Sequence, residues 1–186
     1  VPEQLEVYFD RDRQRVPVHA EGVYGGRRFS LFAQDEIREE EQHAPAPLRD
    51  DLVENYAKQL VIQYFRYPGR RMPIENDEAV AALVFGGLVE FQAVGAVFTT
   101  PAFDRLLTDR KPRVSFGLSL AGNLINLTIS SDDLPASEIG PLLASYKKRK
   151  RYHRLRNGAF VDLKECDLAQ LDRIVSDLNI SGKQLS

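Results

Sequence analysis

The most distinctive chemistry in this 186-residue sequence is a dense run of cations. Ten residues hold seven positive charges, at positions 147–151, 154 and 156, and Tyr146 and His153 lie in the same stretch. Lys and Arg neutralise the phosphates of nucleic acid, and flat rings can stack on bases. The pattern predicts a nucleic-acid-binding set consisting of Lys147, Lys148, Arg149, Lys150, Arg151, Tyr152, Arg154 and Arg156.

A second interpretation of the run stays open. Cations at the end of a helix complement the helix dipole and otherwise remain hydrated. They can also pair with the acidic segment Asp35–Glu41 or dock on an acidic protein surface. On this reading the chain is a protein-interaction or autoinhibitory module without direct nucleic-acid contact.

Charge is distributed unevenly along the sequence. Residues 1–99 hold 11 Lys and Arg against 17 Asp and Glu, whereas residues 100–186 hold 14 against 10. Oppositely charged halves can face different partners or each other.

The sequence motifs of common enzymes are missing. No glycine-rich loop precedes a Lys-Ser or Lys-Thr pair at a helix start, and no Gly-x-Ser-x-Gly segment occurs. The single Cys166 and three scattered histidines have no zinc-ligand spacing, and one cysteine cannot form an internal disulfide. We therefore expect no catalytic residue, no metal site and no cofactor in this chain. A small enzyme assembled from residues far apart in sequence is a third hypothesis.

The apolar runs are far shorter than the ~20 residues of a membrane-spanning helix. The first residues also lack the basic and apolar pattern of a signal peptide. We expect no membrane contact and a cytoplasmic location, associated with the nucleoid if the chain binds DNA.

Hydrophobic periodicity and turn residues predict an α+β fold, with antiparallel β-hairpins packed against about four amphipathic helices. The chain would form one continuous unit or two small lobes, and the predicted division is 1–48 and 49–186. In the first hundred residues we expect strands over Leu5–Phe9, Val16–Tyr24, Phe29–Phe32 and Gly95–Thr99, and helices over Asp35–Gln42, Arg49–Phe65, Glu78–Phe91 and, as a short turn, Pro101–Leu107.

The elements around the cations are predicted from strong turn signals. Asn157-Gly158 suits a tight hairpin, because both residues tolerate positive φ. We expect hairpins over 114–129 and 152–163, a helix over Pro135–Arg149 and a last helix near 168–178. The basic run then lies at the corner between a helix and a strand.

Several segments carry a resemblance to a known family. They are Lys111–Leu120, the turn Ala121-Gly122-Asn123 with Leu124–Leu127, Leu142–Leu163 and Val97–Leu107. Together they resemble the helicase-associated region of bacterial Swi/Snf-type ATPases, most specifically over residues 75–180. In that family a helix ending in a basic run is followed by a Tyr-His-Arg-Leu-x-x-Gly-x-Phe hairpin, as at Tyr152–Phe160 here.

The resemblance implies an accessory segment upstream of a two-lobed, ATP-driven translocase of double-stranded DNA, often behind a zinc-binding module. ATP and Mg²⁺ would belong to the ATPase lobes, which the resemblance places in the same polypeptide as the partner of this segment. Double-stranded DNA is the second expected partner. No catalytic residue carries over to this sequence. The leading hypothesis is therefore a non-catalytic accessory domain that positions DNA or regulates the motor.

Overall fold

The structure is a computed structural model that describes residues 2–32, 50–107, 112–122, 124–166 and 168–177. The predicted helix Asp35–Gln42 lies outside these ranges. Contacts within the chain cluster into two units, residues 1–104 (unit 1) and residues 105–186 (unit 2). The predicted boundary between residues 48 and 49 lies at the end of the undescribed stretch 33–49 and stays a prediction. Each unit is described by itself.

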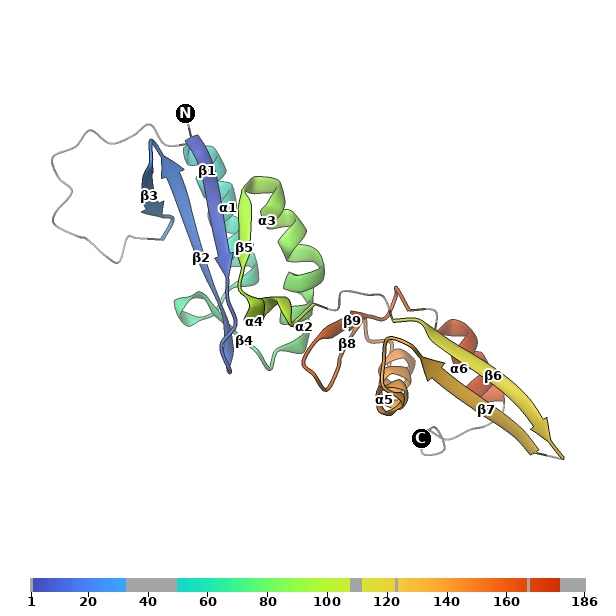
Figure 1. Ribbon diagram of the computed structural model, residues 1–186. Coiled ribbons are helices and arrows are strands. Elements are labelled where there is room, and N and C mark those ends of the chain that lie inside the picture. Colours follow the sequence, from blue (N-terminus) through green and yellow to red (C-terminus); the bar gives the residue numbers. More distant parts are fainter. Residues whose placement is uncertain (1, 33–49, 108–111, 123, 167, 178–186) are drawn as a thin grey trace. The chain divides into compact units, whose positions relative to one another are not determined.

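Unit 1 is built on a mixed sheet with the strand order β3-β2-β1-β5, in which β4 also pairs with β2 (Figure 1). All pairs are antiparallel except β1 with β5, which run parallel. The predicted strands Leu5–Phe9, Val16–Tyr24 and Gly95–Thr99 are confirmed, whereas the strand predicted over Phe29–Phe32 is observed two residues earlier, over Arg27–Ser30. Strand β4 and the parallel pair were not predicted. The strands are β1 (Pro2–Phe9), β2 (Arg15–Tyr24), β3 (Arg27–Ser30), β4 (Arg71–Pro73) and β5 (Ala96–Thr99).

The two long helical stretches of unit 1 begin at side-chain caps. Asp50 accepts a hydrogen bond from the Val53 N–H, and Asn76 accepts one from the Ala79 N–H, which satisfies backbone donors that have no partner within the helix. The second stretch passes through a π-helical turn. The helical elements are α1 (Asp51–Tyr64), η2 (Pro68–Arg70), α2 (Asp77–Ala82), η3 (Leu83–Gly87), α3 (Leu88–Val94) and α4 (Pro101–Asp104).

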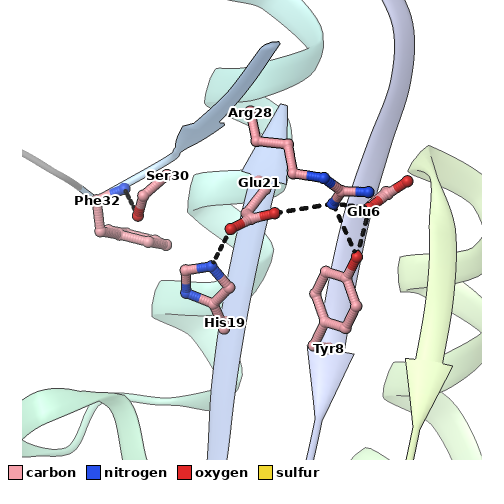
Figure 2. A network of polar contacts seen from close by, with 7 residues as sticks. All are labelled: Glu6, Tyr8, His19, Glu21, Arg28, Ser30 and Phe32. Carbon is pink, nitrogen blue, oxygen red and sulfur yellow. Dashed lines mark hydrogen bonds and ion pairs between the residues drawn. The ribbon is translucent and has the colours of Figure 1, made fainter. Parts of the chain in front are cut away.

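Helices α1 and α3 cover one face of the sheet (Figure 1). Phe9 of β1 lies at the centre of this interface, with ring centroids 5.9 Å from Phe65, 5.1 Å from Phe91 and 5.6 Å from Phe103. The alternating burial of β2 directs its apolar residues to the same side. The other face of the sheet carries polar side chains, among them Tyr8 (Figure 2), and the exposed ring of Phe98 stacked on it.

Unit 2 contains two antiparallel hairpins and two helices, which confirms the predicted α+β class. The elements are β6 (Val114–Ala121), β7 (Leu124–Ser131), α5 (Ala136–Lys147), β8 (Tyr152–Arg154), β9 (Phe160–Asp162) and α6 (Ala169–Asp177). Leu142 and Leu143 of α5 pack with Leu155, Val161 and Leu168 in one buried cluster. This cluster fixes α5 against the β8–β9 hairpin, on either side of the basic run.

The described residues contain neither a candidate membrane-spanning helix nor a candidate metal-binding cluster. None of their helices is long and apolar enough to cross a membrane. None of their His, Cys, Asp and Glu side chains gather in groups of three or more that could hold a metal ion.

Candidate nucleic-acid interface

The basic run begins at a left-handed helix cap. The Lys150 N–H donates to the Ser145 carbonyl (3.1 Å) and the Arg149 N–H donates to the Tyr146 carbonyl (2.8 Å), the two bonds of a Schellman motif. Arg149 has φ = 55°. This position usually holds glycine, because a side chain is strained there. The cap ends α5 and turns the chain towards β8.

Three further hydrogen bonds hold the segment after the cap. The Leu163 N–H donates to the Arg151 carbonyl (2.8 Å), Ser145 Oγ lies 2.8 Å from His153 Nδ1, and buried Glu138 accepts from the Arg156 N–H (2.9 Å). The backbone between 147 and 156 is thus tied to both α5 and the hairpin. The cations therefore project from a backbone that is already ordered.

The cations differ in their partners. Lys147 Nζ lies 3.7 Å from Asp172 Oδ1, and Arg151 Nε lies 3.7 Å from Asp162 Oδ2. Arg151 also covers the Tyr152 ring at 5.1 Å, and Arg154 lies 5.4 Å from the Phe160 ring centroid. Burial raises the pKa of the Tyr152 hydroxyl, although the neighbouring Arg151 opposes the shift. Four exposed cations form no ion pair with any described residue, and these are Lys148, Arg149, Lys150 and Arg156.

Part of the run lines an open cleft of about 630 Å³ on unit 2, which we call the basic cleft. Its lining residues come from the end of α5, the cap, the segment after β9 and one face of α6. They are Tyr146, Lys147, Arg149, Lys150, Arg151, Leu163, Lys164, Asp172 and Ser176. The structure thus brings four of the predicted residues together in one concave site. The other four predicted residues, Lys148, Tyr152, Arg154 and Arg156, are not among the lining residues.

Lys164 is a cation of the site that the sequence analysis missed. The register of the hairpin pairs Tyr152 with Asp162, so residues just after β9 return beside those just before β8. Extending the predicted hairpin by two residues at each end would have placed Lys164 next to the basic run. Asp172 could not be found in this way, because its position depends on the packing of α6.

The open sheet face of unit 1 holds a second polar cluster, which the sequence analysis also missed. Figure 2 shows Arg28 reaching across β2 and β1 to Glu21, Glu6 and the Tyr8 hydroxyl. Tyr8 also donates to Glu6, and His19 Nε2 lies 2.7 Å from Glu21 Oε1. The alternation of polar residues at positions 6 and 8, and at 19 and 21, is the signal that places them on one face.

These contacts hold both carboxylates of the cluster ionised. The Tyr8 hydrogen bond, followed by that of Arg28, lowers the pKa of Glu6, and contact with His19, followed by Arg28, lowers the pKa of Glu21. The bond to Glu6 raises the pKa of Tyr8. Arg28 bonds both carboxylates, so the cluster sets two negative charges against one guanidinium. Both carboxylates have partners, and the excess negative charge gives the cluster no attraction for an anion.

Comparison with known proteins bears on the whole chain. No curated protein and no solved structure matches the sequence significantly. The sequence model of one family, described as "Bacterial SNF2 helicase associated", matches residues 1–186. The matched family is the helicase-associated region and not the ATPase motor itself. The chain therefore belongs to the bacterial SNF2 helicase-associated family.

Proposed function

We propose that this chain is a non-catalytic accessory domain of a Swi/Snf-type DNA-dependent ATPase, and that its basic run contacts duplex DNA and positions it for the motor. The observation that carries the proposal is the set of four exposed cations without an ion pair among the described residues, on a backbone ordered by the cap and three further hydrogen bonds. Because this backbone is already ordered, binding of phosphates has to order only the side chains.

The helix dipole accounts for only part of the run. Its effect is confined to the last turn of a helix, and α5 ends at Lys147. Lys150 and Arg156 lie beyond the last turn of α5. Arg149, moreover, occupies a backbone conformation that glycine would adopt at lower cost. Contact with an anionic partner is a physical reason for cations at these positions.

Binding to duplex DNA can be measured on the purified chain by fluorescence anisotropy across a salt series. If the four unpaired cations each neutralise one phosphate, the slope of log K against log salt is about −3.6. The variant K148E/K150E/R156E removes three of these contacts and adds three repulsive charges. We expect it to lose binding at moderate salt.

The control R13E/R27E/R66E makes the same charge change on exposed cations of unit 1, and we expect it to bind almost as the wild type does. Absence of binding by the wild-type chain at low salt would contradict the proposal. So would equal losses in the two triple variants, because the effect would then follow net charge alone.

The role relative to the motor is tested in the protein that carries the ATPase lobes. If the basic run positions DNA, K148E/K150E/R156E leaves basal ATP hydrolysis unchanged and reduces its stimulation by DNA. Higher basal hydrolysis with intact DNA stimulation would instead indicate the autoinhibitory alternative and contradict DNA positioning.

A further inference from the structure

The basic cleft has a composition that the linear run does not reveal. Five Lys and Arg side chains and one carboxylate, Asp172, are among its lining residues. The cations come from two segments, Lys147–Arg151 and Lys164, which are joined only through the β8–β9 hairpin, and the carboxylate of Asp172 comes from a third, α6. Like charges gathered by a fold repel one another unless an anion offsets them.

Only two of the five cations are offset within the described residues. Lys147 lies near Asp172, and Arg151 lies near Asp162. Arg149, Lys150 and Lys164 are exposed and form no ion pair with any residue that the structure describes. The volume of about 630 Å³ is within the range of small-ligand sites and accommodates a phosphate together with an adjoining sugar.

Asp172 differs from the other lining residues. Its Oδ1 atom is buried and accepts no hydrogen bond from the described part of the chain, and the nearest cation, Lys147 Nζ, is 3.7 Å away. This carboxylate therefore offsets part of the positive charge of Lys147 and adds a negative charge to the lining of the cleft. Both effects oppose the entry of an anion.

We infer that the basic cleft is a phosphate-binding site that takes a phosphodiester group of duplex DNA, with Lys164 as a contact residue and Asp172 as a built-in antagonist. The inference rests on the proposed function and narrows it to one concave site. In the unliganded protein Asp172 partly neutralises Lys147. When a phosphate enters, Lys147 turns from the carboxylate to the ligand.

If Asp172 opposes phosphate, removing its charge should raise the affinity of the protein for duplex DNA. D172N has nearly the same shape, removes the repulsive charge and adds an amide that can donate to phosphate. One charge at close range in a partly solvated site changes binding by about three- to tenfold. We expect D172N to bind duplex DNA three- to tenfold more tightly than the wild type at equal salt, with an unchanged melting temperature.

D177N is the matched control, since it removes an exposed carboxylate from the same helix at a residue outside the cleft lining. We expect it to change affinity less than twofold. K164Q should weaken binding and make the salt slope shallower by about 0.9. Lys148 is an exposed cation outside the lining, so K148Q removes a surface contact and leaves the cleft unchanged. Comparing K164Q with K148Q therefore separates loss of a cleft contact from loss of a surface contact.

These measurements distinguish failure of the cleft as a DNA site from failure of DNA binding by the whole chain. If K148E/R156E, which changes only residues outside the lining, loses DNA binding while D172N equals D177N and K164Q equals the wild type, DNA is bound by the surface around Lys148 and Arg156 and the cleft proposal is wrong. Inorganic pyrophosphate serves as a probe for small phosphate compounds, measured by titration calorimetry. Pyrophosphate binding that is strengthened by D172N, without any binding of duplex, would keep the cleft as a phosphate site and discard both its assignment to DNA and the proposed function.

Discussion

Replacing Arg149 by glycine is expected to stabilise the protein while it weakens DNA binding. Arg149 has φ = 55°, and the left-handed conformation costs a residue with a side chain about 1–2 kcal/mol. Glycine relieves that strain but loses about 0.5–1 kcal/mol more entropy on folding. The difference leaves a gain of about 0.5–1 kcal/mol in the free energy of unfolding. Both cap hydrogen bonds use backbone atoms and survive the substitution.

The gain in stability is measured by urea unfolding followed by circular dichroism, and the loss of binding by anisotropy. R149G should lose one phosphate contact, which makes the salt slope shallower by about 0.9. R149A loses the same charge without relief of strain, so we expect weaker binding and no gain in stability. R149K keeps the charge and the strain, so both quantities should stay near wild type.

A lower or equal unfolding free energy in R149G would show that the conformation of Arg149 does not strain the cap. Unchanged DNA affinity in both R149G and R149A would remove Arg149 from the interface.

Two further predictions concern the packing of each unit. A Cβ at Gly95 would lie 2.3 Å from the Leu5 carbonyl oxygen, so G95A should lower the free energy of unfolding by about 1–3 kcal/mol. In the control G117A the added methyl group meets open space, so the free energy of unfolding should change by less than about 0.5 kcal/mol. Equal urea midpoints for G95A and G117A would contradict the close approach of Gly95 to Leu5. Burial, with Asp162 and Glu165 nearby, raises the pKa of Cys166 to about 11, so at pH 8 roughly one molecule in a thousand is a thiolate. A thiol reagent should therefore label Cys166 only in urea, and fast labelling of the folded protein would show that the thiol is accessible.

Elements whose signals are local in the sequence were predicted well. The helix over Arg49–Phe65 is observed as Asp51–Tyr64, and the hairpin around Asn157-Gly158 pairs Arg154 with Phe160. Apolar periodicity and turn residues act over a few neighbouring positions, so a single sequence contains them. The parallel pairing of β1 with β5 joins Glu6 to Ala96 across ninety residues. No local pattern specifies that pairing, because it depends on the helices that connect and cover the strands.

A cationic corner between a helix and a hairpin could be predicted from the amino-acid sequence, because consecutive charges and turn residues are properties of short segments. Which of those cations share a site depends on the packing of segments that are distant in the sequence. Lys148 and Arg156 belong to the run but do not line the basic cleft, whereas Lys164 and Asp172 lie outside the run and line it. The physical reason is that the cap at Arg149 and the buried cluster around Leu142 set the directions of α5, the hairpin and α6. The electrostatic field of the site follows from those directions, not from the order of the charges along the chain.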